Sequence, residues 1–487
     1  MKVNEKMAAG EVKITPRDED YSQWYLDVIF GADLAEYGPT KGSMIIKPSG
    51  YALWEKIQNF LDKSFKDMSV QNVYFPMLIP ERLLKKEENH VEGFSPEVAV
   101  VTYAGGEKLE EALIVRPTSE TIMYETFSRW IQSHRDLPLL INQWVNVVRW
   151  ELRPRLFLRT TEFLWQEGHT AHSNHEEADL FARKILDLYA TFAKDIMAIP
   201  VILGIKTENE KFAGASKTYC VEAMMQDGKA LQFATSHNLG QNFAKAFNIQ
   251  FTNENNQGSF VWQTSWGLST RTIGGLIMVH SDDKGLVLPP NIAPIKIVII
   301  PIWNSEESKN LVLKHALGLH DELISEYGNT VVIIDDRDMR SGQKHYQWEK
   351  KGIPVRIEIG PRDISGGTVV AVRRDTSKKI VLPALELSRS LRELFTDIQN
   401  SLYSKALALR DLKTVDVENW NDFLENIEAG NFIQAYWDGS SETEKKIKEE
   451  TKATIRCIPF TLEKVPEGKC IYSGNPTAIK VIFARSY

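Results

Sequence analysis

The chain has few cysteines and no long apolar run. Only three cysteines, Cys220, Cys457 and Cys470, occur among its 487 residues, which are too few for the disulfide framework of a small secreted protein. The longest apolar stretch, residues 295–303, is broken by a lysine and a proline and is far shorter than the roughly 20 residues of a membrane-spanning helix. The first eleven residues lack the apolar segment of a secretion signal. These absences predict a protein of the reducing cytoplasm with no membrane partner.

Two common phosphate-binding motifs are also missing. The sequence contains no G-x-x-x-x-G-K-[ST] loop and no strand-linked G-x-G-x-x-G, so any phosphate must be bound by side chains. Four arginines surround one expected hairpin loop, and a fifth follows the string S-W-G. The planar guanidinium group suits phosphate oxygens, but arginines on a hairpin are also common surface residues. The five are Arg149, Arg153, Arg155, Arg159 and Arg271.

Net charge argues against indiscriminate binding of polyanions. The chain carries a formal charge of -7, although a local basic patch remains compatible with that total. Residues 335–379 contain eleven Lys and Arg against seven Asp and Glu. This surplus fits either a solvated charged face or a nucleic-acid contact. The length predicts about three domains at roughly 150 residues each.

Hydrophobic periodicity divides the chain into helices and strands. Helical spacing over residues 51–65 predicts an amphipathic helix, and a strand should follow it up to Pro76. Asn174 should cap a second helix through residue 197, with an apolar side that includes Leu180. Short strands over residues 217–225 and 230–235 complete an α+β domain built on an antiparallel sheet.

The pattern changes after a proline-rich linker at residues 287–294. Strands then alternate with helices, which indicates a parallel-type α/β unit. A last region begins with a long helix and ends in a strand-rich tail, as expected for a small α+β domain. The predicted domains are residues 1–287, 288–395 and 396–487.

Charged and aromatic residues alternate along residues 149–169. Side chains two apart share a face of a strand, and a face that mixes rings with ionisable groups is typical of a ligand pocket rather than of a core. The residues concerned are Arg149 and Glu151 before the loop and Phe163, Trp165, Glu167 and His169 after it.

These strings resemble the motifs of class II aminoacyl-tRNA synthetases. The helix and strand ending at Pro76 resemble motif 1, R-W-E with the returning strand resembles motif 2, and G-L-S-T-R-T-I-G resembles motif 3. R-P-T-S-E, W-Q-E-G-H and T-S-H-N-L-G-Q-N-F are similar to strings of prolyl-tRNA synthetases of the archaeal and eukaryotic-like type. The resemblance covers nearly the whole chain.

The resemblance implies a proline–tRNA ligase that uses ATP with Mg²⁺ as its cofactor. L-Proline would be activated to prolyl-adenylate and then transferred to tRNA(Pro), and alanine or cysteine could be misactivated. A threonine or glycine synthetase is disfavoured by W-Q-E-G-H and by the lack of a zinc triad. A catalytically inactive paralogue is disfavoured because the motif arginines are present.

Residue by residue, the resemblance assigns two substrate sites. Arg149 and Arg271 would be the catalytic residues: Arg149 would contact the α-phosphate, and adenine would lie between Phe163 and Arg271. Trp165, His169 and His237, taken singly, are more often core residues, and only the motif context places them in a pocket. The ATP residues are Arg149, Glu151, Arg159, Thr160, Phe163, Gln232, Thr235 and Arg271; the proline residues are Thr118, Glu120, Arg149, Trp165, Glu167, His169, His237 and Ser265.

The remaining expectations concern metals and partners. Glu222 is the candidate Mg²⁺ ligand. Zinc is not expected, because Lys464 and Tyr472 stand where relatives often have cysteines and two thiolates cannot complete a tetrahedral site. The resemblance further implies a homodimer through motif 1, no editing domain between motifs 2 and 3, and a terminal Tyr487 that reaches toward the catalytic domain. The anticodon of tRNA would be read by Glu349, Lys350, Arg356 and Glu358.

Overall fold

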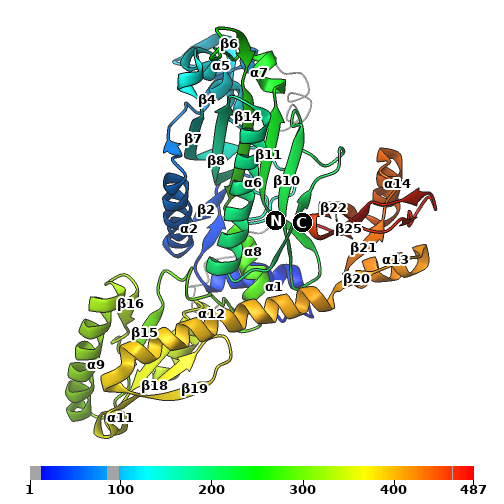
Figure 1. Cartoon of the computed structure of the whole chain (residues 1–487). Coiled ribbons are helices and arrows are strands. Elements are labelled where there is room, and N and C mark those ends of the chain that lie inside the picture. The colour runs from blue at the N-terminus through cyan, green and yellow to red at the C-terminus, as the bar shows by residue number, and fades with distance from the viewer. Residues whose placement is uncertain (1–12, 85–97, 463) are drawn as a thin grey trace.

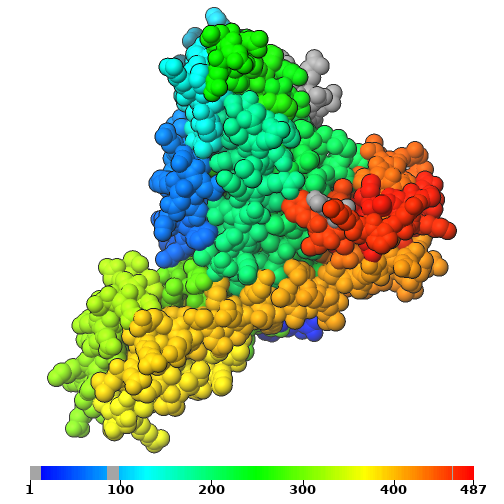
Figure 2. Space-filling view, viewed as in Figure 1, coloured from blue at the N-terminus to red at the C-terminus, as the bar shows by residue number. Residues whose placement is uncertain are grey.

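The computed structural model describes residues 13–84, 98–462 and 464–487. It has a large first part, an α/β second part and a C-terminal part, and one long helix crosses between the last two (Figure 1). In Figure 2 the C-terminal part lies against the side of the first part. The α+β class predicted for the first and last parts and the α/β class predicted for the second part are confirmed.

The first part is built on an antiparallel sheet. Its strands follow the order β9, β10, β11, β14, β8, β7, with the short β3 pairing in parallel at the edge. Their bounds are β3 Gln71–Asn72, β7 Leu139–Val148, β8 Glu162–His172, β9 Val201–Ile205, β10 Lys217–Met224, β11 Ala230–Gly240 and β14 Trp262–Ser269. Smaller sheets are the pair β1 Ala35–Tyr37 and β2 Met44–Ile46, the three strands β4 Leu78–Pro80, β6 Glu107–Val115 and β5 Ala99–Ala104, and the pair β12 Gln250–Thr252 and β13 Gly258–Phe260.

Helices cover this sheet. The expected helix over residues 51–65 is confirmed as α2, Pro48–Asp67, and its apolar residues Leu53, Trp54 and Ile57 are buried. The helix capped by Asn174 is α6, followed by a π-helical turn. The other helices are α1 Tyr21–Gly31, α3 Glu81–Leu84, α5 Glu120–Trp130, α6 His175–Thr191 with the turn Phe192–Ile196, α7 Asn242–Ala246 and α8 Arg271–His280.

Two local predictions were wrong. Leu180, assigned to the apolar side of α6, is 56% exposed, because the buried stripe instead follows Ala178, Ala182 and Ile185. The strand expected up to Pro76 is only two residues long. Its ladder ends where the Phe75 amide donates to the side chain of Gln143 at 3.0 Å rather than to a backbone carbonyl.

The second part has a mixed sheet. Strands β16, β15 and β17 run parallel, as predicted, but β18 and β19 add antiparallel hairpins on one edge. The elements are β15 Ile297–Pro301, α9 Glu306–Tyr327, β16 Val332–Ile334, α10 Ser341–Lys350, β17 Val355–Ile359, α11 Pro361–Gly366, β18 Thr368–Arg373 and β19 Lys379–Pro383.

Helix α12, Leu387–Leu412, ties the last two parts together. Its first half packs in the core of the second part through Leu391, Ile398 and Leu402, so the expected boundary at residue 395 falls inside a helix. The tail then extends the first sheet, because β22 pairs with β9. The remaining elements are β20 Thr414–Asp416, α13 Trp420–Glu428, β21 Phe432–Tyr436, α14 Ser441–Thr451, β22 Thr454–Pro459, β23 Gly468–Lys469, β24 Pro476–Thr477 and β25 Lys480–Ala484.

Candidate active site

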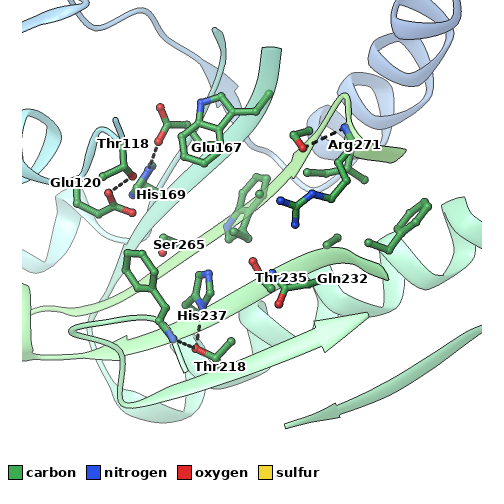
Figure 3. Close-up of a pocket in the computed structure, with 18 of the residues that line it drawn as sticks. Thr118, Glu120, Glu167, His169, Thr218, Gln232, Thr235, His237, Ser265 and Arg271 are labelled. Atoms are coloured by element: carbon green, nitrogen blue, oxygen red, sulfur yellow. Dashed lines mark hydrogen bonds and ion pairs between the residues drawn. The ribbon is translucent and has the colours of Figure 1, made fainter. Parts of the chain in front are cut away.

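A cavity of about 230 Å³ lies over one face of the first sheet. Strands β8, β11 and β14 form its floor, and the start of α5 forms one wall (Figure 3). Phe163, Trp165, Glu167 and His169 all line it, which confirms that alternate residues of β8 share a face. Beyond the expected strand, Arg149 also reaches the cavity, whereas Glu151 does not line it, because β7 ends at Val148 and the alternation stops there.

Strand register brings distant residues together in the cavity. Antiparallel pairing sets His169 opposite Ser265, Ser265 opposite His237, and His237 opposite Thr218. Directly opposed residues point to the same face of a sheet. One row across four strands therefore carries three of the predicted residues.

The carboxylate of Glu167 is the centre of a buried network. Its Oε1 accepts hydrogen bonds from Ser119 Oγ at 2.5 Å and from Gln143 Nε2 at 2.7 Å, and its Oε2 lies 3.2 Å from His169 Nε2. Burial alone would raise the pKa of Glu167, but the bonds from His169, Ser119 and Gln143 outweigh it and hold the pKa below the ordinary value. Glu167 is therefore an anion at neutral pH.

A second carboxylate stands beside it. Glu120 opens α5 and is buried, and it accepts a hydrogen bond from Thr118. Figure 3 shows Thr118 and Glu120 at the same end of the pocket as His169. Two carboxylates in one small cavity favour a ligand with a positively charged amine.

The histidine on the facing strand is neutral. Burial, helped by His169, lowers the pKa of His237 to about 3. Its Nδ1 lies 2.9 Å from Thr218 Oγ1. The ring therefore contributes shape and a hydrogen-bonding nitrogen to the pocket without adding charge at neutral pH.

The opposite end of the pocket is basic. Arg271 lies there (Figure 3), and its Nε donates to the carbonyl of Leu158 at 3.2 Å. Burial, together with the charges of Arg159 and Arg149, lowers the pKa of Arg271 to about 10. Guanidinium groups held so close to one another create a site for a polyanion. Arg149 also stacks over Phe163 and Trp165, with its guanidinium carbon 5.6 and 5.2 Å from the two ring centres.

Three residues that line the cavity each have a buried polar atom without a hydrogen bond among the described residues. These atoms are Trp165 Nε1, Ser265 Oγ and Trp266 Nε1. A buried polar atom without a partner is costly. A polar ligand in the cavity would satisfy those of the three atoms that it reaches.

Of the other predicted ATP residues, two lie outside the cavity lining and two belong to it. Arg159 is exposed, although its charge acts on Arg271. Thr160 is buried and bonds the carbonyl of Glu162 at 2.7 Å. Gln232 and Thr235 do line the cavity. Tyr487 packs against the first part, with its ring centre 5.0 Å from the guanidinium of Arg155.

Glu222, the candidate metal ligand, is engaged elsewhere. It is 1% exposed and lies outside the cavity lining. Its oxygens pair with Lys206 Nζ at 2.7 Å and Arg456 Nη2 at 3.0 Å. A magnesium ion would have to displace both cations, so the geometry argues against Glu222 as a ligand. Throughout the described residues, no three His, Cys, Asp or Glu side chains cluster as metal ligands.

The structure adds pocket residues that sequence reasoning missed. Glu210 and Phe212 lie on the loop between β9 and β10, and Thr218 lies at the start of β10. The ring of Phe212 lies 4.7 Å from that of His237. Thr218 faces the cavity because it lies opposite His237 on β11, and this register is not given by the sequence pattern. A loop residue such as Phe212 carries no periodic signal.

A second cavity, of about 210 Å³, lies beside α10. Among its lining residues are five cations and one carboxylate. Of the four predicted anticodon residues, Glu349 and Arg356 line it. Glu358 is adjacent and bonds Arg356 Nη2 at 2.9 Å, whereas Lys350 is buried with its Nζ 4.0 Å from the ring centre of Tyr346. The cations are Lys284, Arg356, Arg373, Arg374 and Lys379.

All three cysteines are buried, and none of them forms a disulfide. Tyr472, at one expected zinc position, instead donates to Glu450 at 2.5 Å and packs on Trp420. Within the described ranges, no helix has the length and apolar character needed to cross a bilayer.

Comparison with known proteins places this geometry in a family. The family model described as tRNA synthetase class II core domain (G, H, P, S and T) matches residues 102–280, Anticodon binding domain matches 296–394, and Prolyl-tRNA synthetase, C-terminal matches 420–487.

Full-length relatives agree with these matches. The Proline--tRNA ligase of Chlorobium chlorochromatii (strain CaD3) is 54% identical over 483 residues, which cover 98% of this chain and 99% of the relative. That of Chloroherpeton thalassium is 52% identical over 482 residues, with the same coverage. That of Phocaeicola vulgatus is 52% identical over 497 residues, 99% of this chain and all of the relative. The chain therefore belongs to the proline–tRNA ligase family, the prolyl-tRNA synthetases with a class II core.

Proposed function

We propose that this protein joins L-proline to tRNA(Pro) in two steps at the first cavity. The observation that carries the proposal is the division of that cavity into an acidic end, with Glu120 and Glu167, and a basic end, with Arg149 and Arg271. The ammonium group of the amino acid complements the acidic end, and the phosphates of ATP complement the basic end. The cavity brings the two substrates together in one place.

In the first step the proline carboxylate attacks the α-phosphate of ATP and pyrophosphate leaves. The nucleophile is already ionised at neutral pH, so no general base is required. Catalysis then comes from alignment of the reactants and from neutralisation of the developing phosphate charge. Arg149 contacts the α-phosphate for that purpose, and Arg271 holds the adenine against Phe163.

Proline is selected by its secondary ammonium and its ring. Thr118 and Glu120 accept its two N–H groups, and Glu167 supplies a further negative charge. Trp165, His169 and His237 enclose the ring. The hydroxyl of Ser265, which has no hydrogen-bond partner among the described residues, bonds a polar atom of the substrate. Alanine and cysteine are small enough to enter the same pocket, which makes misactivation an expected side reaction.

In the second step the 3'-hydroxyl of the terminal adenosine of tRNA(Pro) attacks the carbonyl carbon of prolyl-adenylate, so that an ester bond forms, the anhydride bond to the phosphate breaks and AMP leaves. When the tRNA binds for this step, the second cavity recognises its anticodon. A guanine presents two donors and one acceptor on its Watson–Crick edge. Glu349 can accept from the donors, and Arg356 can donate to the acceptor. Glu358 orients Arg356, and Lys350 supports the helix rather than the base.

The subtype is proposed to be the archaeal and eukaryotic-like one, without an editing insertion. Residues 170–270 between motifs 2 and 3 are taken up by α6, β9, β10, β11, α7, β12, β13 and β14. These elements belong to the catalytic fold itself. Removal of mischarged alanine would then fall to another protein.

The protein is proposed to act as a cytoplasmic homodimer. At the end of motif 1 and just beyond it, Tyr74, Met77 and Leu78 have 74%, 39% and 40% of their surface exposed. Apolar residues gathered in this way favour a protein contact. Replacing Met77 with arginine should convert the dimer to a monomer in sedimentation equilibrium, and a wild-type monomer would refute the assignment.

Metal content is proposed as Mg²⁺ with ATP and no zinc. Magnesium keeps several waters and is bound largely by substrate phosphates, which agrees with the ion pairing of Glu222. The purified protein should contain less than about 0.1 zinc per chain by elemental analysis, since two thiolates do not complete a structural site. Stoichiometric zinc would overturn this part.

Proline-dependent ATP–pyrophosphate exchange tests the proposed function. Proline should support exchange far better than alanine, cysteine, threonine or glycine. Preference for threonine or glycine would identify a different class II synthetase. Absence of exchange with every amino acid would identify an inactive paralogue.

A further inference from the structure

The loop between β9 and β10 forms one wall of the amino-acid end of the pocket. Glu210 and Phe212 line the cavity from this loop, and the Phe212 amide donates to Thr218 Oγ1 at 3.0 Å. Thr218 in turn bonds His237. The position of the loop therefore sets the space around the proline ring.

This loop is attached to the C-terminal part at its base. Lys206 Nζ donates to the carbonyl of Arg456 at 2.7 Å, and the backbone beside it pairs with β22 through Ile205 and Ile458. Arg456 also reaches back to Glu222 on β10. Strand β9, which leads into the loop, is thus bonded to the C-terminal part of the protein.

Helix α14 holds the loop itself. The two oxygens of Glu444 accept from Thr207 Oγ1 and Asn209 Nδ2, each at 2.8 Å. One turn further along α14, Lys448 Nζ donates to Glu210 Oε1 at 3.2 Å. Three of the four loop residues from Thr207 to Glu210, all except Glu208, are therefore bonded to one helix.

The contact between Glu444 and Thr207 is buried, so it should hold the loop more strongly than the exposed contact of Lys448. Glu444 is 4% exposed and Thr207 is 3% exposed, whereas Lys448 has a 57% exposed side chain. Exposed ion pairs contribute little, but removing a buried acceptor leaves the buried hydroxyl of Thr207 unpaired, whereas the exposed amide of Asn209 can bond water. Glu444 is the main attachment and Lys448 a weaker one.

We propose that Glu444 and Lys448 are positioning residues for amino-acid selection. Through Thr207, Asn209 and Glu210 they hold Phe212 against the pocket, so the C-terminal part sets the size of the proline site from outside it. The inference rests on the proposed function and assigns to the C-terminal part a task in the first step of the reaction. A loosened loop admits amino acids of other shapes.

The test compares Glu444→Ala with Glu442→Ala in the full-length protein. Glu442 lies on the same helix and pairs only with the neighbouring Lys446 among the described residues. Glu444→Ala should raise the KM for proline about tenfold and lower the ratio of kcat/KM for proline over alanine about fivefold, as expected for loss of a buried acceptor. The KM for ATP should change less than about twofold. Glu442→Ala should match the wild type.

Glu444→Gln and Lys448→Met keep the test valid if Glu444→Ala does not fold. Glutamine retains one acceptor oxygen, so its effect should be intermediate. Lys448→Met should have a smaller effect, and Lys446→Met none. Hydrogen exchange of the amides of residues 207–212 should become faster in the Glu444 variants, in the order Ala, Gln, wild type.

Two results would overturn the inference. One is equal behaviour of the Glu444 and Glu442 variants in proline KM and selectivity; the other is a parallel loss of proline and ATP affinity, which would indicate general destabilisation. Absence of proline-dependent exchange in the wild type would instead refute the proposed function, so the two failures are distinguishable.

Discussion

The carboxylate of Glu167 and the imidazole of His169 lie side by side on β8, with Oε2 and Nε2 3.2 Å apart and both side chains almost fully buried. Because they are two residues apart, both project from the same face of the strand. The pair supplies negative charge and an apolar ring face at one end of the cavity.

Removing this charge should weaken proline binding. Glu167→Gln keeps the shape but removes one of the two carboxylates, Glu120 and Glu167, at the ammonium end of the cavity, so the KM for proline should rise roughly 10- to 100-fold, in the range of a lost charged hydrogen bond. The KM for ATP should remain nearly constant. Steady-state pyrophosphate exchange measures both constants. Glu162→Gln, on the exposed start of the same strand, is the control, and an equal effect from it would contradict the role of Glu167.

Acid should destabilise the protein through its buried histidines. Burial lowers the pKa of His172 and His280 to about 4 and that of His237 to about 3. Unfolded histidines titrate near 6.5, so the unfolded chain takes up protons first and stability is lost as pH falls below about 6.5. Each group contributes up to about 1.4 kcal/mol per pH unit between its two pKa values.

Urea unfolding at pH 7.5 and pH 5 checks this pH dependence. His280→Gln should reduce the pH dependence of stability by about one proton, because burial keeps His280 neutral in the folded state even though its bond to the Met197 carbonyl favours the charged form. An unchanged urea midpoint between the two pH values would contradict the assignment.

The buried ion pairs of Glu222 predict an asymmetric response to mutation. Arg456→Met removes one cation from a carboxylate that is 1% exposed, and should cost roughly 3–5 kcal/mol of stability. Replacing Lys206, Glu222 and Arg456 together with apolar residues should cost less, since no uncompensated charge stays behind. Thermal denaturation followed by circular dichroism compares the two variants, and a triple variant less stable than Arg456→Met would refute this explanation.

Charge reversal at Glu358 should affect tRNA rather than ATP. Glu358→Lys would repel Arg356 and Lys379, which now lie 2.9 and 3.4 Å from its oxygens. The KM for tRNA should rise at least about tenfold, while pyrophosphate exchange changes much less. Aminoacylation assays with Glu386→Lys as a control outside the second cavity distinguish local from general charge effects. Loss of both activities would refute anticodon reading at this site.

Several features of this protein follow from the sequence alone. The apolar spacing of Leu53, Trp54 and Ile57 determines a helix, because a 3.6-residue period has one buried face. The period-two alternation from Phe163 to His169 likewise determines a strand with one pocket-facing side. Local periodicity fixes local structure, so these elements could be predicted without any knowledge of their partners.

Only the tertiary structure decided which partners those elements meet. The sequence makes Glu222 a candidate metal ligand beside the nucleotide site. In the fold, however, its carboxylate pairs with Lys206 and with Arg456, which is 234 positions further along the chain. No periodic pattern in the sequence indicates that the loop with Phe212 is attached to Glu444. Such contacts depend on strand register and on the pairing of β22 with β9. Contacts between residues far apart in the sequence arise from packing, and packing is a property of the whole fold.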